Sequence, residues 1–316
     1  MGLSDLVASV RSRISDCPLS TATPPRSMGR RANCLMRCLL TAFWLLDYVQ
    51  SLSSIPATIA GHAVRPVRVP LRPNLAVTVF DASDHQWWAS QGTADLATGQ
   101  TVANVYGLKL WPGALAVAES LTSLAAARES SSLAGLTVLE LGCGNGLASL
   151  TAAALGAEEV TATDISESAL LFTRSASTFG GLDDRLSTRH FDVLGCDRAG
   201  AVPLPSADIV LVADLLYEPA LARGVAQRVA EGEARGSCVI IAGDPDRHAR
   251  ADFLEAYSRI VGVKEQRFFE PGFSVRLDAL KWKSKRVEVA VLNQGAFVVS
   301  DDGTCPMSAR SMEMAL

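Results

Sequence analysis

The stretch from Val138 to Gly146, Val-Leu-Glu-Leu-Gly-Cys-Gly-Asn-Gly, constrains the fold more than any other part of the chain. Its apolar residues predict a buried strand, and the alternate glycines predict a tight turn at the carboxyl end of that strand. The apolar run from Leu147 to Leu155 then predicts a helix. In this order, the three elements let backbone N–H groups approach a ligand closely. An ordinary turn between strand and helix has no need of so many glycines, so the pattern favours a ligand-binding turn.

An acidic residue, Asp164, stands where the next strand is expected to end. The short β-branched run Val160–Thr163 predicts that strand. Asp164 lies 18 residues after Gly146, close to the ~20 expected of a carboxylate that holds a ribose diol. A dinucleotide-binding fold has a similar layout, but its fingerprint requires a third glycine where this chain has Leu147.

The glycine turn, with Glu140 two residues before its first glycine, resembles motif I of the seven-strand S-adenosylmethionine-dependent methyltransferases. The resemblance implies an α/β fold, a Rossmann-like sheet of seven mostly parallel strands with helices on both faces. It also implies S-adenosyl-L-methionine as the cofactor, with its methionine part on the glycine turn. The cofactor-binding residues that it implies here are Gly142, Gly144 and Gly146 of the turn, together with Glu140 and Asp164.

Two further motifs narrow the resemblance. A strand is predicted over residues 208–213, and its continuous apolar run from Ile209 suits burial on both faces. Asp214 follows at its carboxyl end, where open α/β sheets bind ligands. Asp214-x-x-Tyr217, together with a Trp111-Pro112 pair that opens a predicted helix, resembles the protein-lysine methyltransferases of the methyltransferase-16 type. In that family the tryptophan lies beside the cofactor.

The remaining site residues follow from the same resemblance. A strand predicted over Arg189–Val193 carries Asp192, which with Val193 is implied on the adenine side, and the Ala213 backbone is implied to touch the cofactor. The family usually has an Asn-rich helix end before this strand, and this chain departs from that pattern at residues 173–177. Gly-Asp-Pro-x-Arg over residues 243–247 looks like the branch that methylates the β subunit of electron-transfer flavoprotein.

The predicted function is methyl transfer to a lysine side chain of a protein. Asp214 is expected to position the incoming lysine and Tyr217 to line its channel. No metal is expected, because the sulfonium methyl group is already electrophilic. Two alternatives stay open: a methyltransferase acting on a small molecule or another side chain, and a non-catalytic cofactor-binding assembly factor.

Composition bounds the partners. A net charge of −4 in 316 residues gives no electrostatic case for nucleic acid, and the expected partner is a protein that presents a lysine to a monomeric enzyme. The seven cysteines include no C-x-x-C pair, so a structural zinc site is not expected. The protein is expected in a reducing compartment.

The first 70 residues differ from the rest, with eight arginines, no lysine and no glutamate. Arg-rich, Ser-rich, acid-poor composition is typical of organelle transit peptides. The apolar run at residues 38–46 is too short for a bilayer span, which needs ~20 residues. It fits a signal-type apolar core, a helix that docks on the domain, or an artefact of gene prediction. A mitochondrial, plastid or cytoplasmic location therefore stays open.

The expected organisation has three parts. Residues 1–60 form an N-terminal extension, residues 64–300 a methyltransferase domain that begins with a small β-hairpin, and residues 301–316 a tail. The hairpin is predicted from two β-rich runs, Val67–Leu71 and Leu75–Phe80. Val263–Phe269 and Val287–Leu292 are predicted as the last two strands of the main sheet.

Overall fold

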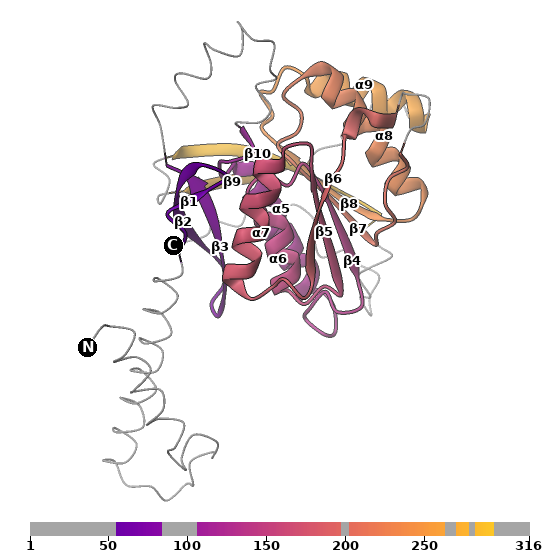
Figure 1. The fold of residues 1–316 in the computed structure, drawn as a ribbon. Coiled ribbons are helices and arrows are strands. Elements are labelled where there is room, and N and C mark those ends of the chain that lie inside the picture. Colours follow the sequence, from indigo (N-terminus) through magenta and orange to yellow (C-terminus); the bar gives the residue numbers. More distant parts are fainter. Residues whose placement is uncertain (1–54, 84–105, 197–201, 263–269, 278–281, 294–316) are drawn as a thin grey trace, which may run out of the picture. The chain divides into compact units, whose positions relative to one another are not determined.

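The computed structural model describes residues 55–83, 106–196, 202–262, 270–277 and 282–293 (Figure 1). Internal contacts divide the chain between Ile55 and Pro56, and all structural statements below concern the second unit. The N-terminal extension, its apolar run and the tail lie outside the described residues, so the predicted domain boundaries and location stay predictions.

The described part opens with a small antiparallel sheet of three strands, β1 (Thr58–Ile59), β2 (His62–Arg72) and β3 (Leu75–Ala82). The predicted hairpin is confirmed, and it is longer than the two β-rich runs suggest. Its strands pair from Val64–Ala82 to Arg72–Leu75.

The main sheet has seven strands in the order β6-β5-β4-β7-β8-β10-β9. From β6 to β8 the neighbours are parallel, whereas β10 runs antiparallel to both β8 and β9. The strands are β4 (Thr137–Leu141), β5 (Glu159–Asp164), β6 (Leu186–His190), β7 (Ile209–Ala213), β8 (Cys238–Gly243), β9 (Glu270–Leu277) and β10 (Trp282–Leu292). The predicted fold class, a mostly parallel seven-stranded sheet preceded by a hairpin, is confirmed.

The strand order places a switch point between β4 and β7. From β4 the chain moves outward to β5 and β6, then crosses back to β7 on the other side of β4 and continues to β8. At a switch point the connections leave in opposite directions, which opens a crevice at the carboxyl ends of the two strands. Gly142 follows β4 and Asp214 follows β7, so both lie at this crevice.

Helices cover both faces of the sheet (Figure 1). Those on one face are α5 (Pro112–Ala126), α6 (Leu147–Ala154) and α7 (Glu167–Gly180), and those on the other are α8 (Pro219–Ala234) and α9 (Arg250–Val261). A short 3-10 helix, η1 (Val193–Cys196), packs against α8.

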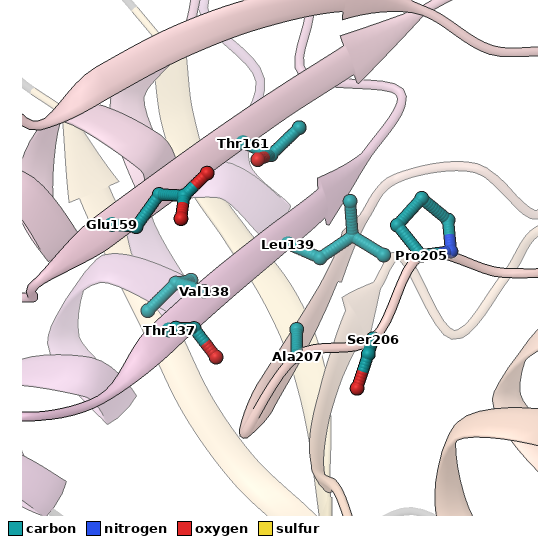
Figure 2. Close-up of a pocket in the computed structure, with 8 residues that line it drawn as sticks. All are labelled: Thr137, Val138, Leu139, Glu159, Thr161, Pro205, Ser206 and Ala207. Atoms are coloured by element: carbon teal, nitrogen blue, oxygen red, sulfur yellow. The ribbon is translucent and has the colours of Figure 1, made fainter.

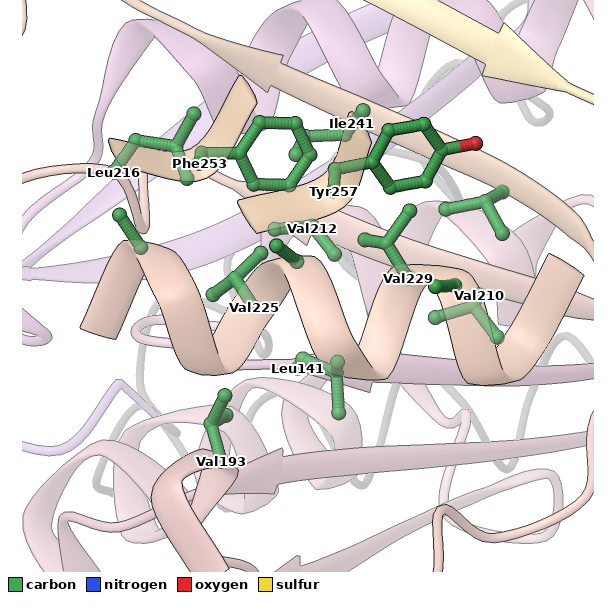
Figure 3. Packing of buried hydrophobic residues seen from close by; sticks show 14 of the residues in the cluster. Leu141, Val193, Val210, Val212, Leu216, Val225, Val229, Ile241, Phe253 and Tyr257 are labelled. Atoms are coloured by element: carbon green, nitrogen blue, oxygen red, sulfur yellow. The ribbon is translucent and has the colours of Figure 1, made fainter. Parts of the chain in front are cut away.

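Side chains alternate between the two faces along each strand, and those on one face form the core beneath α8 and α9. Leu141, Val212 and Ile241 come from three adjacent strands and share one buried cluster with residues of both helices. Figure 3 shows Val225 of α8 and Phe253 of α9 meeting this layer of the sheet. The apolar runs of β4, β7 and β8 are therefore explained by burial on both faces, which makes the sheet a rigid support for the loops at its carboxyl edge.

One predicted strand is wrong in its bounds. The expected strand over Arg189–Val193 is observed at Leu186–His190, because β6 pairs with β5 and that partner ends at Asp164, opposite His190. Asp192 therefore lies beyond the strand. The strand expected over 263–269 falls outside the described residues. The strand expected over Val287–Leu292 is confirmed as part of β10, which lies between β8 and β9.

A cavity of about 60 Å³ lies at the opposite end of the strands (Figure 2). It is lined by residues from the first halves of β4 and β5 and from the segment before β7: Thr137, Val138, Leu139, Glu159, Thr161, Pro205, Ser206 and Ala207. Because ligands of open parallel sheets bind at the carboxyl ends of the strands, this cavity is separate from the crevice at the switch point.

Candidate active site

The glycine turn after β4 depends on backbone conformations that side chains disfavour. Gly142, Gly144 and Gly146 have φ values of 65°, 54° and 84°, all in the left-handed region. A Cβ on Gly142 would lie 2.5 Å from the Leu215 side chain, and one on Gly144 would lie 3.1 Å from the Gly107 carbonyl oxygen. The turn therefore packs tightly against the chain that follows β7 and against the chain that precedes α5.

Asp164 ends β5 beside this turn. Its Oδ2 accepts a hydrogen bond of 3.0 Å from the Gly144 N–H, and its Oδ1 accepts one of 2.8 Å from Ser166. The residue is 8 % exposed, and burial raises the pKa of its carboxyl group while these N–H groups lower it. A carboxylate has about four acceptor positions. The Ile165 N–H also bonds to this carboxylate, so three positions are used and one remains for a ribose hydroxyl group.

Glu140 has a different environment from Asp164. It is 1 % exposed, and its Oε2 accepts hydrogen bonds from both the backbone N–H and the hydroxyl of Ser149 in α6. Burial raises the pKa of Glu140 to about 8. This carboxyl group holds α6 against β4. Its role in cofactor binding stays a prediction, and in this structure it would act through the position of the helix.

Asp214 follows β7 in a left-handed conformation, with φ of 54°, which is uncommon outside glycine. Its Oδ2 accepts a hydrogen bond of 2.5 Å from the Gly113 N–H, and the Asp244 backbone N–H also bonds to the carboxylate. Burial raises the pKa of Asp214 to about 6, while these bonds and the charge of Arg247 lower it. At neutral pH the group is an anion that accepts hydrogen bonds.

Three aromatic rings, those of Tyr106, Trp111 and Tyr217, lie close to one another. The Tyr106 ring lies 5.9 Å from the Trp111 ring and 6.5 Å from the Tyr217 ring, measured between centroids. The Trp111 indole N–H donates a 2.7 Å hydrogen bond to the Tyr106 carbonyl, which fixes the two residues together. Burial raises the pKa of Tyr217 to about 12, so its hydroxyl keeps its proton at neutral pH. The Asp214 carboxylate binds Gly113, two residues after Trp111, and Tyr217 stands three residues after Asp214. These residues and Tyr106 are grouped below as the rim of the site.

The adenine-side residues lie at η1. Asp192 accepts a 2.9 Å hydrogen bond from the Leu194 N–H, which turns the chain into η1, and the adjoining Val193 is buried. Ala213 is the last residue of β7. The structure thus puts Ala213 at the crevice and gives Asp192 a turn-forming bond. The cofactor roles of these three residues stay predictions.

Sequence reasoning missed three residues of the rim. Gly113 is one, because a Cβ there would lie 2.5 Å from the Asp214 carboxylate. Tyr106 is the second, and Arg247 the third, with its guanidinium 5.7 Å from the centre of the Trp111 ring. Arg247 stands in the Gly-Asp-Pro-x-Arg motif, so a signal for it was present in the sequence. Nothing local singles out Gly113 or Tyr106.

A buried acid, Asp81 of β3, holds the segment that leads to Trp111. Its Oδ1 accepts a 3.0 Å hydrogen bond from the Leu110 N–H, and its Oδ2 pairs with Arg65 at 2.7 Å. The Ala82 N–H also donates to the Leu108 carbonyl at 3.0 Å. The small sheet therefore supports one wall of the candidate site.

These residues fit S-adenosylmethionine on structural grounds. The left-handed glycine turn lets the backbone approach a ligand without side chains in between, and an acid at the end of the next strand touches that turn. The Asp214 carboxylate follows β7, the strand on the other side of β4 from β5, and Tyr217 comes three residues later. The Tyr106 ring lies 5.9 Å from the Trp111 ring and 6.5 Å from the Tyr217 ring. In the described part of the chain, no group of His, Cys, Asp and Glu side chains is arranged to hold a metal ion.

Fold and site together define an S-adenosylmethionine-dependent methyltransferase of the Rossmann-like class. Residues 91–260 match the methyltransferase-16 family, described as lysine methyltransferase. Since this match spans more than half of the chain, the protein belongs to that family.

Individual relatives match over shorter stretches. The electron transfer flavoprotein beta subunit lysine methyltransferase of Danio rerio is 30% identical over 137 residues, which are 43% of this chain and 48% of the relative. The ribosomal protein L11 methyltransferase of Alteromonas mediterranea is 44% identical over 54 residues, 17% of this chain and 18% of the relative. The chain thus spans less than half the length of the curated relatives that it matches.

Solved structures with similar folds include two with bound nucleosides. Magnesium protoporphyrin IX methyltransferase from Synechocystis, with bound SAH, has a TM-score of 0.40 and 17% identity, and the match covers 66% of this chain and 97% of that one. The 16S rRNA methyltransferase of Thermus thermophilus, with AdoMet and guanosine, has a TM-score of 0.43 and 17% identity, with coverage of 74% and 51%. Among the described residues, every helix falls short of the length and apolar character of a membrane span.

Proposed function

We propose that this enzyme transfers a methyl group to a lysine side chain of a protein. The observation that carries the proposal is the rim around Asp214, where a carboxylate is combined with the rings of Trp111, Tyr106 and Tyr217. Carboxylates and aromatic faces are the groups that attract an ammonium ion. The family description and the flavoprotein-directed relative support the same acceptor.

The cofactor supplies an electrophilic methyl group on a sulfonium. Asp164, at the end of β5, and the glycine turn would hold it on one side of the crevice. Asp214 and Tyr217 would orient the lysine nitrogen from the other side. Holding two reacting groups in line in this way can supply ~7–11 kcal/mol of the barrier.

A lysine amine must be neutral to attack, and its ordinary pKa is ~10.4. Enclosure among the aromatic rings favours loss of the proton, whereas the Asp214 anion opposes it. Asp214 is therefore a hydrogen-bond acceptor that positions the nitrogen, and its own pKa of about 6 makes it a weak base. The Tyr217 hydroxyl, with a pKa of about 12, stays protonated and is available as a donor and acceptor in the channel.

The test uses the full chain, labelled S-adenosylmethionine and an organelle lysate, with Asp214→Ala as the inactive partner. Label that disappears on protease treatment and maps to a lysine by mass spectrometry would support the proposal. Purified electron-transfer flavoprotein β subunit is the first single acceptor to try. Label on RNA, on a small molecule or on another side chain would contradict the proposal and favour the alternative methyltransferases.

A further inference from the structure

Arg247 lies beside the candidate site without taking part in the proposed transfer. It stands in the loop after β8, at the same sheet edge as Asp214, and its guanidinium carbon is 5.7 Å from the centre of the Trp111 ring. Its charge lowers the pKa of both Asp214 and Tyr217. The residue is therefore close to both of the groups expected to handle the acceptor.

Among the described residues, the Arg247 guanidinium has neither a hydrogen-bond acceptor nor an ion-pair partner, and its Nε is buried without one. A guanidinium offers five N–H donors, and a buried donor left unsatisfied is unfavourable. Arg250, three residues along the chain, shows the usual arrangement, since it pairs with Glu288. Arg247 is thus a cation whose N–H donors lack an acceptor among the described residues.

The nearest acid does not supply this acceptor. The Asp214 carboxylate is bound by the backbone N–H groups of Gly113 and Asp244, and it makes no ion pair with Arg247. Trp111 lies beside the guanidinium, whose carbon is 5.7 Å from the ring centre. A guanidinium without a protein acceptor suits a planar anion that accepts parallel hydrogen bonds.

We propose that Arg247 binds a carboxylate of a ligand in the crevice. One source is the α-carboxylate of the methionine part of S-adenosylmethionine, which the neighbouring glycine turn is expected to hold. The other is an acidic side chain near the target lysine of the acceptor protein, and this second source rests on the proposed function.

The two sources are distinguished by calorimetry on the full chain with two nucleosides. S-adenosylhomocysteine carries the carboxylate, and 5′-methylthioadenosine shares the nucleoside without it. If the cofactor is the source, Arg247→Met weakens S-adenosylhomocysteine binding on the order of 10- to 100-fold, and methylthioadenosine binds as before. Arg247→Lys, which keeps the charge and loses the fork, falls between. Arg259→Met, an exposed position on α9, is the control and changes neither affinity.

If the acceptor protein is the source, both nucleosides bind Arg247→Met normally. The KM for the acceptor found in the lysate assay then rises on the order of 10-fold, with kcat nearly unchanged. Equal losses for both nucleosides would show a structural role and overturn the inference, as would an unchanged affinity together with an unchanged KM. If no acceptor protein is labelled, the proposed function fails by itself and the nucleoside comparison alone decides on Arg247.

Discussion

Asp164 and Asp214 each follow a buried parallel strand, yet their carboxylates are held in different ways. Asp164 accepts N–H groups from Ser166 and Gly144, which are 2 and 20 residues away in sequence. The Gly113 N–H bound by Asp214 is 101 residues away. We call residues 140–166 the turn side and residues 106–113, 213–217 and 244–247 the rim side. The turn side is built locally, and the rim side is assembled from three remote segments.

The difference suggests a division of labour. A turn whose hydrogen bonds are local suits a cofactor common to many methyltransferases. The rim, made of segments remote in sequence, touches that turn through Gly107 and Leu215. Its other side chains can vary, which suits a site that selects the acceptor. Loops at strand ends carry such variation on a fixed scaffold. Substitutions on the two sides should therefore separate cofactor affinity from transfer.

The largest effect is expected from Asp214→Ala. Loss of the carboxylate removes the acceptor that positions the lysine nitrogen, and a displacement of ~1 Å can cost ~100-fold in rate. Single-turnover methyl transfer should fall by about that factor. The matched control is Asp208→Ala at the opposite end of β7, where the carboxylate binds Thr137 and lies away from the crevice. Near wild-type transfer by Asp214→Ala would remove Asp214 from the reaction.

The turn side could be predicted from the sequence because its signals are adjacent in the chain. The glycine spacing and Asp164 are read within one strand–helix–strand unit, and the structure puts them in contact. The strand bearing Asp192 was misplaced because its limits are set by pairing with β5, which a short polar stretch does not reveal.

Most residues of the rim side could not be predicted from the sequence. Asp214 and Tyr217 could be predicted because they belong to one short motif. Gly113 is required only because the Asp214 carboxylate closes on it, and that contact exists only in three dimensions. Asp81 was assigned to no role, since its partner Leu110 lies 29 residues further along the chain.

The second-largest effect concerns the support of the rim. Asp81→Ala leaves the buried Leu110 N–H without an acceptor and should lower the free energy of unfolding by ~1–3 kcal/mol. Arg65→Gln removes only the half-exposed partner and should cost less than ~1 kcal/mol. Thermal or denaturant unfolding of both variants gives the comparison. Equal effects would show that the ion pair, and not the Leu110 bond, is what matters.

A smaller effect is expected from Tyr217→Phe, which keeps the ring and removes the hydroxyl. Loss of one neutral hydrogen bond is worth ~1 kcal/mol, about fivefold in transfer rate. The cofactor affinity should not change. A loss as large as that of Asp214→Ala would mean that the hydroxyl takes part directly in moving a proton.

The remaining expected effect is a pH dependence of stability. The pKa of Asp214 is raised to about 6 in the folded protein, above its ordinary value near ~4. The folded state therefore holds the proton more tightly, and the stability that this gives is present below about pH 4 and lost as the pH rises through about 6. Asp214→Asn has no such loss. Its Tm relative to wild type should increase from pH 4 to pH 7, and a constant difference would place Asp214 in a more solvated environment.

The division of labour is tested most directly by calorimetric titration of S-adenosylhomocysteine into Asp164→Ala and Asp214→Ala side by side. Asp164→Ala is expected to weaken binding by ~1.5–3 kcal/mol, the scale of lost charge-assisted hydrogen bonds. Asp214→Ala is expected to bind within a few-fold of wild type. Asp184→Ala removes an exposed acid outside the site and controls for the loss of one negative charge. Normal binding by Asp164→Ala, or an equal loss in Asp214→Ala, would contradict the account.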